Sequence, residues 1–252
     1  MTTFMRVSAI TVCWNSEAVL GRALASLRAQ TWSDIQMVIV DGGSTDGTVS
    51  LARTLARDGD VIVSEPDDGI YNAMNKGLTL ATGDLIYFLN SDDRLFSPDV
   101  IADIAAVAAG GSADIIVGDV LMCNKDVRFR KSHAHIRRWN LVHERICHQA
   151  AFVRRAVFER FGGFDERYRI SADHEFFVRA LRRGATLEYV PKVIAEFQLG
   201  GVSSGAALVQ RAETKDILRR YERPLDVPLL LGYRAVRKAY RAIKGHWLDR
   251  PP

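Results

Sequence analysis

The sequence LIYFLNSDD, residues 85–93, places five apolar side chains directly before four polar ones. A short apolar run that stops abruptly at polar residues is typical of a strand buried on both faces of a parallel sheet. In such sheets, ligands bind at the carboxyl ends of the strands. The stretch therefore predicts a strand of an α/β fold, with a candidate binding site where the strand ends, at Asn90, Ser91, Asp92 and Asp93.

The residues before this stretch repeat the same alternation. Apolar runs predict strands over residues 7–13, 35–40 and 61–64, and helical spacing predicts helices over residues 17–30, 48–57 and 71–80. Strands separated by helices indicate a mostly parallel central sheet with helices on both of its faces.

The second half of the chain has a looser pattern. Strands are predicted over residues 115–122, 127–131, 150–153, 187–190 and 193–197, with one helix ending near residue 161 and another over residues 173–183. We find no internal repeat, and we expect this half to extend the first sheet instead of folding separately.

The composition excludes several classes of protein. The 252 residues are 48% hydrophobic and 25% charged, with a mean hydropathy of −0.04, which is ordinary for a soluble globular chain. No apolar run reaches the roughly 18 residues that a membrane span needs, and the N-terminus lacks a signal-peptide pattern. Three scattered cysteines, Cys13, Cys123 and Cys147, favour a reduced, cytoplasmic setting.

The net charge of +4 is unevenly distributed. Residues 205–252 hold 11 of the 34 basic and 5 of the 30 acidic side chains, an excess of six positive charges, which leaves residues 1–204 with an excess of two negative ones. Over residues 229–248, five basic side chains lie on one helical arc. The adjacent arc is apolar and consists of Leu229, Tyr233, Val236, Tyr240, Ile243 and Trp247.

This basic and apolar helix predicts peripheral contact with an anionic membrane. The alternative is that its apolar arc packs on the body of the protein or on a second copy, as a homodimer. Nucleic acid is a poorer partner, because the body is net acidic and no recognition motif is present.

Polar residues also follow the strand over residues 35–40, in the turn DGGSTDG, residues 41–47. Asp41 precedes the glycines and is placed to accept a hydrogen bond from a nucleotide base or ribose. Capping of the next helix is the alternative for the other polar residues of this turn.

The adjacent carboxylates Asp92 and Asp93 repel each other, and a hard divalent cation would compensate. Mg²⁺ or Mn²⁺ bridging a substrate diphosphate fits this chemistry. A turn and helix cap before Pro98 is the alternative. The sequence contains no G-x-G-x-x-G after its first strand and no P-loop motif, so a dinucleotide dehydrogenase and a P-loop enzyme are disfavoured.

Together these segments resemble family 2 glycosyltransferases, which have the GT-A fold. The matching segments, in order, are SAITVCWN (8–15), VDGGSTDG (40–47), EPDDGIYNAMNKG (65–77), ATGDLIYFLNSDD (81–93), CHQA (147–150), GGFDE (162–166) and SADHE (171–175). The resemblance covers about residues 6–204. Residues 65–77 are similar to the non-processive subset that builds exopolysaccharides and glycolipids.

The resemblance implies roles for the matching residues. Trp14 stands where an aromatic side chain stacks on the nucleobase, and Asp41 where an aspartate bonds the edge of the base. Asp173 falls where the family places its catalytic base; stabilising the first turn of its helix is the alternative, and Glu175 is the fallback base. The implied donor-binding set is Cys13, Trp14, Asn15, Glu17, Asp41, Lys76, Asn90 and Ser91.

The sequence departs from the family pattern in two places. Val12-Cys13 replaces the usual Pro-Thr, and Asn90 replaces the first Asp of the D-x-D motif. Because an amide brings no charge, Asp92, together with Asp93, must hold the cation.

Other residues have weaker assignments. Candidates for contact with the acceptor or the diphosphate are His148, Gln149, Glu175 and Ser203. Ser203 belongs to a loop, GGVS (200–203), that resembles the family's flexible lid. A hydrogen-bonded structural role is the alternative for His148, and a solvated helix face for Lys76. His133 and His135 share one face of a predicted strand but have no third ligand, which favours a polar surface.

The sequence thus predicts an inverting, metal-dependent transfer from a UDP- or GDP-type sugar to a lipid-linked or glycan hydroxyl, at the inner face of the cytoplasmic membrane. The catalytic GT-A domain is expected over residues 1–204, with a donor half to about residue 113 and an acceptor half over 114–204. A basic helical extension follows over 205–252. The alternatives are a nucleotidyltransferase that uses the same acidic pair and a membrane-docking protein with a degenerate donor site.

Overall fold

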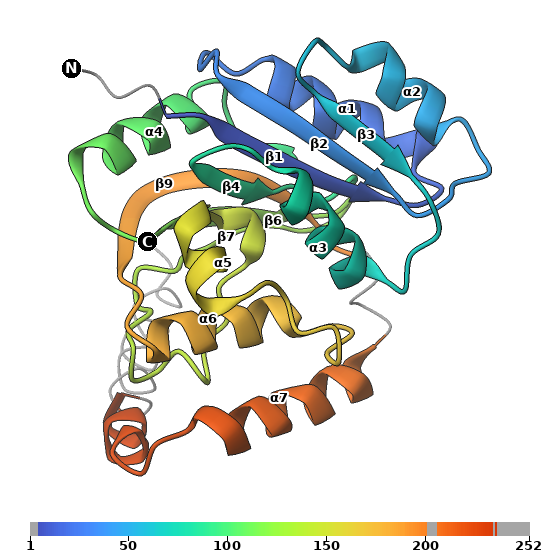
Figure 1. Ribbon diagram of the computed structural model, residues 1–252. Helices are drawn as coiled ribbons and strands as arrows, with labels where there is room; N and C mark the ends of the chain where they lie inside the picture. The colour runs from blue at the N-terminus through green and yellow to red at the C-terminus, as the bar shows by residue number, and fades with distance from the viewer. Residues whose placement is uncertain (1–4, 201–205, 234, 236–252) are drawn as a thin grey trace, which may run out of the picture.

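The computed structural model describes residues 5–200, 206–233 and 235. One sheet of nine strands runs through both halves of the chain, in the order β3-β2-β1-β4-β8-β6-β9-β5, with β7 attached to β6. Helices cover the two faces of this sheet (Figure 1). The predicted α/β class is confirmed.

The first half of the chain follows the predicted alternation. Its elements are β1 (Val7–Cys13), α1 (Glu17–Arg28), β2 (Ile35–Asp41), α2 (Thr48–Leu55), β3 (Val61–Ser64), α3 (Ile70–Leu80) and β4 (Leu85–Phe88). Strand β1 pairs in parallel with both β2 and β4, and β2 pairs in parallel with β3. The apolar side chains of β1 and β4 are buried on both faces, as the unbroken runs predicted.

The second half adds antiparallel strands to the same sheet. Its elements are β5 (Arg94–Leu95), α4 (Val100–Gly110), β6 (Ile115–Cys123), β7 (Arg128–Lys131), the 3₁₀ turn η1 (His148–Ala150), β8 (Ala151–Arg154), α5 (Arg155–Phe161), α6 (Ala172–Arg182), β9 (Leu187–Gln198) and α7 (Ala207–Tyr221). The two strands predicted over 187–190 and 193–197 form one strand, β9. Register shifts at Asp119 of β6 accommodate the irregularity around Pro191.

The segments predicted to form the site lie together at one end of the sheet, where the parallel strands have their carboxyl ends. Strands β1, β2 and β4 end there, and β8 begins there because it runs antiparallel to β4, with Tyr87 opposite Phe152. The turn η1, directly before β8, therefore lies beside the residues that follow β4. Strand β9 ends at the same edge, where the backbone N–H of Gln198 bonds to Asp93.

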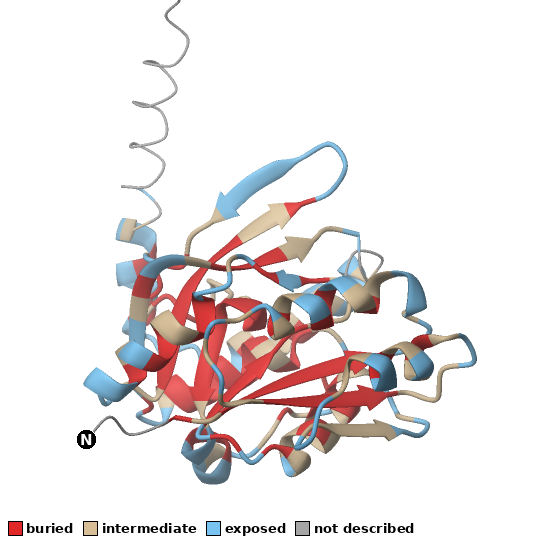
Figure 2. Cartoon of the chain, turned by 90° about the horizontal axis from the view of Figure 1, so that it is seen from above, coloured by how far each residue is buried: buried red, intermediate tan, exposed pale blue. Residues whose placement is uncertain are grey.

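The core consists of two apolar clusters, one on each face of the sheet. Side chains of α1, α2 and α4 pack on one face, and those of α3, α5 and α6 pack on the other. Figure 2 shows the buried strands between these layers. At the centre, the rings of Tyr87 and Phe152 stack with centroids 4.3 Å apart, joining β4 to β8.

Within the described part of the chain, no helix is long and apolar enough to cross a membrane. Residues 226–233 are helical. Leu229 and Leu231 of this helix are 54% and 60% exposed, whereas Leu230 between them is buried. Residues 234 and 236–252, which hold most of the predicted basic helix, and Ser203 of the predicted lid lie outside the described residues.

Candidate functional site

Asp41 anchors the turn that follows β2. Its carboxylate accepts hydrogen bonds from the backbone N–H groups of Gly43 (3.1 Å) and Ser44 (2.9 Å), and from the hydroxyls of Ser64 (2.7 Å) and Ser44. Burial raises the pKa of Asp41, but these bonds outweigh burial and leave the pKa below its ordinary value. The structure therefore shows that Asp41 stabilises the loop. Its contact with the nucleobase of the donor stays a prediction.

Three more of the predicted donor residues hold the same loop. Asn15, at φ +46°, accepts a hydrogen bond from the N–H of Thr45 (2.9 Å), and Glu17 accepts one from the N–H of Gly47 (2.9 Å). The Cys13 thiol lies 3.8 Å from Asp41, and burial, with the charge of Asp41, raises its pKa to about 12. These side chains shape the loop through contacts within the protein.

Trp14 and Lys76 differ in how open they are to a ligand. Trp14 is 66% exposed at the end of β1, so its ring presents a face on which a flat ligand can stack. The ammonium of Lys76 pairs with Glu65 (2.7 Å) and donates to the carbonyl of Pro66 (2.9 Å). Lys76 thus steadies the loop before α3.

The two adjacent carboxylates after β4 have different surroundings. Both oxygens of Asp93 are occupied, one by the Gln149 side-chain amide (2.7 Å) and one by the Gln198 N–H (2.8 Å). Burial and the charge of Asp92 raise the pKa of Asp93 to about 7. Asp92 is half-buried, and within the described residues its carboxylate has no hydrogen bond or ion pair to another residue. Burial raises the pKa of Asp92, although a hydrogen bond from its own backbone and the charges of His148 and Arg22 oppose this rise. Nearby, the Ser91 hydroxyl donates to the Ser16 hydroxyl (3.1 Å).

Asp173 is held at the start of α6 by contacts from both halves of the chain. Its carboxylate accepts hydrogen bonds from the Tyr71 hydroxyl of α3 (3.1 Å) and from the backbone N–H of His174 (2.7 Å). The His148 Nδ1 atom lies 3.1 Å from the other carboxylate oxygen, and His148 Nε2 lies 3.2 Å from Asn90 Oδ1. His148 therefore bridges the predicted base and the predicted donor motif.

The bridge has a simple chemical requirement. A neutral imidazole carries one N–H donor, so His148 can satisfy two oxygen partners only as an imidazolium, or with the Asn90 amide turned so that its NH₂ donates. An amide at position 90 permits either arrangement, whereas the aspartate usual in the family permits only acceptance.

The contacts of Asp173 keep its carboxyl group ionised. Burial raises the pKa of Asp173, but the hydrogen bond and charge of His148, together with the charge of Arg145, outweigh burial and lower the pKa below its ordinary value. A buried carboxylate that is ionised, oriented and close to the donor motif can accept a proton from an incoming hydroxyl.

The structure does not bring Glu175 into this group. Glu175 is buried, where it accepts hydrogen bonds from the guanidinium of Arg179 (3.0 Å) and from the hydroxyl of Tyr221 (2.5 Å). Gln149 is likewise committed to Asp93. Of the described residues that were predicted to contact the sugar acceptor or the diphosphate, His148 is the one that contacts Asp173.

The prediction of a polar surface at His133 is wrong. Strand β7 ends at Lys131, and His133 is buried, with Nδ1 2.7 Å from the carbonyl of Gly118 and Nε2 accepting from the Cys147 N–H (3.2 Å). His135 instead meets Glu144 (3.1 Å). The two imidazoles therefore have separate partners, and no group of three or more His, Cys, Asp or Glu side chains in the described residues could hold a metal ion.

Two residues of the site were missed by sequence reasoning, Tyr71 and Arg145. Tyr71 lies in one of the family-like segments, but its partner Asp173 is 102 positions away, and no local pattern links them. Arg145 lies in an irregular segment before η1, where its spacing carries no signal.

Comparisons with known proteins identify the family of the chain. The family described as Glycosyl transferase family 2 matches residues 8–189, and the chain belongs to this family of glycosyltransferases. The PGL/p-HBAD biosynthesis glycosyltransferase Rv2957 of Mycobacterium tuberculosis is 38% identical over 196 residues, which are 75% of this chain and 76% of that protein. The uncharacterized glycosyltransferase Rv1514c of the same organism is 33% identical over 230 residues, covering 88% and 87%.

Solved structures confirm the predicted GT-A fold. S. aureus TarS 1-349 in complex with UDP-GlcNAc superposes with a TM-score of 0.72 at 19% identity, over 86% of this chain and 65% of that one, so the chain spans less than two thirds of TarS 1-349. The mannosyltransferase PcManGT from Pyrobaculum calidifontis, in complex with GDP-Man and Mn²⁺, gives a TM-score of 0.69 at 19% identity, over 98% and 76%.

Proposed function

We propose that the enzyme transfers one sugar from a UDP- or GDP-type nucleotide sugar to an acceptor hydroxyl, with inversion at the anomeric carbon. The observation that carries this proposal is the hydrogen-bonded bridge from Asn90 through His148 to Asp173, which sets an ionised base beside the donor motif. Fold neighbours named in complex with UDP-GlcNAc and with GDP-Man support a nucleotide-sugar donor.

The residues present fit a divalent cation shared with the substrate. Within the described residues, the half-buried carboxylate of Asp92 has no bond to another residue, whereas the oxygens of Asp93 are already occupied. Mg²⁺ is commonly held by one or two carboxylates plus substrate phosphates. We therefore assign Mn²⁺ or Mg²⁺ to Asp92, where the ion would neutralise the charge that develops on the departing diphosphate.

The protein's own residues explain the proton transfer. As the acceptor oxygen attacks C1 of the sugar, Asp173 takes its proton, and a single displacement from the face opposite the diphosphate inverts the anomeric centre. A carboxylate with a lowered pKa serves this purpose because the hydroxyl becomes acidic only as the new bond forms. His148 and Tyr71 each contact one oxygen of Asp173, which fixes the orientation of the carboxylate.

Calorimetry and product analysis test this function. UDP or GDP should bind more tightly with Mn²⁺ than without it, and a panel of nucleotide sugars should yield a nucleoside diphosphate by slow hydrolysis. Absence of nucleotide binding in both conditions would contradict the proposal. Release of inorganic diphosphate from a nucleoside triphosphate would instead identify a nucleotidyltransferase.

We further propose that the acceptor is a lipid-linked or glycan hydroxyl at the inner face of the cytoplasmic membrane. The helix over residues 226–233 exposes Leu229 and Leu231, and Leu225 just before it is 82% exposed. Residues 205–252 carry six excess positive charges, which suits an anionic lipid surface. Tyr233 packs on Trp139 (5.4 Å between centroids), which attaches this helix to the catalytic body.

A further inference from the structure

Helix α7 lies beyond the region that matches the family, residues 8–189, yet it contacts the loop that delivers Asp173. Figure 1 shows α7 running below α6, whose first turn holds Asp173. We define the base loop as residues 168–171, which immediately precede α6.

Glu213 of α7 makes the central contact with the base loop. Glu213 is 9% exposed, and its carboxylate accepts hydrogen bonds from the backbone N–H groups of Arg169 (2.6 Å) and Ile170 (3.1 Å). Hydrogen bonds to an ionised acceptor are about twice as strong as neutral ones. The carbonyl of Ile170 in turn lies 3.0 Å from the Tyr71 hydroxyl, whose single proton is shared between this carbonyl and Asp173.

Arg145 makes a second connection, at the end of the base loop. Its guanidinium donates to the Ser171 hydroxyl (2.9 Å) and to the Thr214 hydroxyl of α7 (2.7 Å). Ser171 is fully buried and directly precedes α6. The same cation contributes to the low pKa of Asp173, so the position of Arg145 affects the charge as well as the placement of the base.

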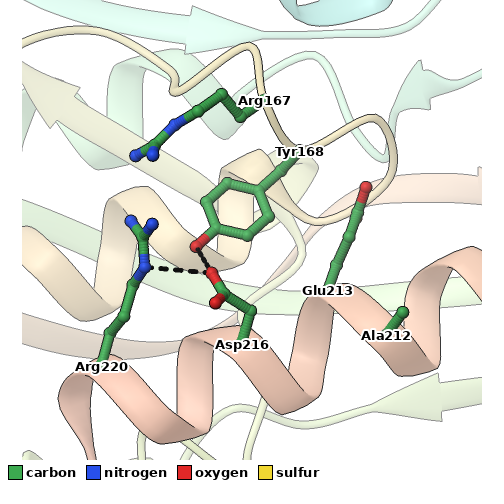
Figure 3. Close-up of a pocket in the computed structure, with 6 residues that line it drawn as sticks. All are labelled: Arg167, Tyr168, Ala212, Glu213, Asp216 and Arg220. Atoms are coloured by element: carbon green, nitrogen blue, oxygen red, sulfur yellow. Dashed lines mark hydrogen bonds and ion pairs between the residues drawn. The ribbon is translucent and has the colours of Figure 1, made fainter.

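A cavity of about 320 Å³ separates α7 from the start of the base loop. Figure 3 shows its lining side chains, Arg167, Tyr168, Ala212, Glu213, Asp216 and Arg220. Across it, the Tyr168 hydroxyl donates to Asp216 (2.5 Å), which also pairs with Arg220 (3.0 Å). Beside this pocket, buried Tyr168 of the base loop and buried Ile217 of α7 belong to one apolar cluster, so polar bonds and apolar packing together hold the base loop against α7.

We propose that α7 is a clamp on the base loop and that Glu213 is a positioning residue for Asp173. This inference rests on the proposed function of Asp173 as the base. Within the described residues, no hydrogen bond or ion pair joins α7 to Trp14, Asn90 or Asp92 on the donor side, so loss of the clamp lowers turnover and leaves donor binding intact. Misplacing a catalytic group by about 1 Å costs on the order of 100-fold in rate.

Glu213→Gln in the full chain tests the clamp, with Glu222→Gln as the matched control. Glu222 lies at the end of the same helix and pairs with His143 (2.8 Å), away from the base loop. In Glu213→Gln, hydrogen exchange of the Arg169 and Ile170 amides should become about tenfold faster. The kcat should fall roughly 10–100-fold, while Kd for the nucleotide changes less than about twofold. The control should match the wild type in all three measurements.

The pH dependence of kcat/KM distinguishes a positioning role of Glu213 from a general loss of stability. The ionisable groups that face Asp173 are His148, Tyr71, Arg145, His174 and Cys147, and none of them changes in the variant. A looser base loop weakens the contacts that lower the pKa of Asp173, so the acid limb of kcat/KM should move to higher pH. A purely structural role would lower the melting temperature and leave this limb in place.

Thr214→Val provides a second variant if Glu213→Gln does not fold, because it removes only the hydroxyl bonded to Arg145. Faster amide exchange at residues 169–171 with unchanged nucleotide Kd would support the clamp. Wild-type exchange and kcat in a folded variant, or equal losses of kcat and nucleotide affinity, would overturn it. If the wild type itself releases no nucleoside diphosphate, the proposed function fails, while amide exchange still decides whether α7 holds the loop.

Discussion

At the scale of single residues, the site depends on which hydrogen-bond partners each of two neighbouring carboxylates has. Asp92 and Asp93 are adjacent in the sequence, and both were predicted to hold the cation, but Gln149 and Gln198 occupy Asp93 and leave Asp92 open. The sequence predicted where the acidic side chains lie. It could not predict which carboxylate remains free to bind a cation, because the partners of Asp93 lie 56 and 105 positions away.

Asp92→Asn should remove the effect of Mn²⁺ on nucleotide binding. The amide keeps the shape of the side chain but loses the anionic oxygen that a hard cation requires. Titration calorimetry with UDP or GDP should show at least a tenfold loss of affinity in Mn²⁺ and little change without it. Asp58→Asn, at an exposed turn before β3, is the control. If the variant retains the Mn²⁺ dependence, Asp93 and not Asp92 binds the cation.

Asp173→Asn should abolish transfer and preserve donor binding. The amide keeps the contacts of Tyr71 and His148 approximately in place, but it cannot accept the acceptor proton. General-base catalysis contributes about 10²–10⁴-fold, so the rate of nucleoside diphosphate release with acceptor should fall by at least 100-fold. Nucleotide affinity should stay within twofold. Transfer at more than a tenth of the wild-type rate would show that another group is the base.

At the scale of helices and strands, unbroken apolar runs predicted the parallel strands well. The predicted bounds of β1 and β3 agree with the structure, because polar residues lie close to both ends of each run. Helix α4 and the two-residue strand β5 were not predicted. β5 exists only because Arg94 and Leu95 pair with Glu196 and Ala195 of β9, and no local pattern encodes such a long-range pairing.

Gly83, in the turn before β4, is required by packing between elements. A Cβ atom there would lie 2.5 Å from the backbone nitrogen of Ser8 and 2.9 Å from the carbonyl of Arg6. Gly83→Ala should therefore destabilise the fold by about 1–3 kcal/mol in urea unfolding. Gly110→Ala is the control, because a Cβ there meets nothing within 4 Å, and alanine in a helix favours folding by up to about 1 kcal/mol. Equal stability of the two variants would contradict this explanation.

Buried His133 should make stability fall in acid. It joins the bulge of β6 to Cys147 as a neutral ring, and burial lowers its pKa to about 4. The unfolded chain binds this proton near pH 6.5, so between pH 6.5 and 4 the unfolded state holds more protons and is favoured as the pH falls. The loss between pH 7 and 5 should be on the order of 2 kcal/mol.

Urea unfolding at pH 5 and pH 7 measures this loss. His133→Asn should be less stable at pH 7 but should lose less stability on acidification. His135→Asn, whose imidazole is partly exposed beside Glu144, is the control and should keep the wild-type slope. An unchanged slope in His133→Asn would assign the acid sensitivity to other groups, such as buried His174.

At the scale of the whole molecule, one continuous sheet explains why distant segments form one site. The antiparallel direction of β8 brings η1 to the carboxyl ends of β1, β2 and β4, and α6 then places Asp173 beside His148. The exposed helix over residues 226–233 follows α7, so the proposed membrane contact and the proposed clamp belong to one continuous C-terminal segment.

Replacing Leu229 and Leu231 together by Ser should weaken binding to anionic vesicles. Two exposed leucines that enter the lipid interface would contribute several kcal/mol at most, so partitioning should fall roughly 10–100-fold. Leu208→Ser, at an exposed position of α7, is the control, and vesicles of neutral lipid test the role of charge. If the double variant binds like the wild type, or if sedimentation shows a homodimer that these serines disrupt, the apolar face serves another partner.

The sequence by itself determined the class of fold and the end of the sheet where we expect the chemistry, because apolar periodicity and strand-end residues are local properties of the chain. The acidic pair was found in the same way, whereas the candidate base came from the resemblance of residues 171–175 to the family. Only the tertiary structure decided that Asp92 and not Asp93 is open, that His148 bridges Asn90 and Asp173, and that α7 holds the base loop. Those facts depend on contacts between residues up to 105 positions apart, and such contacts exist only once the sheet has formed.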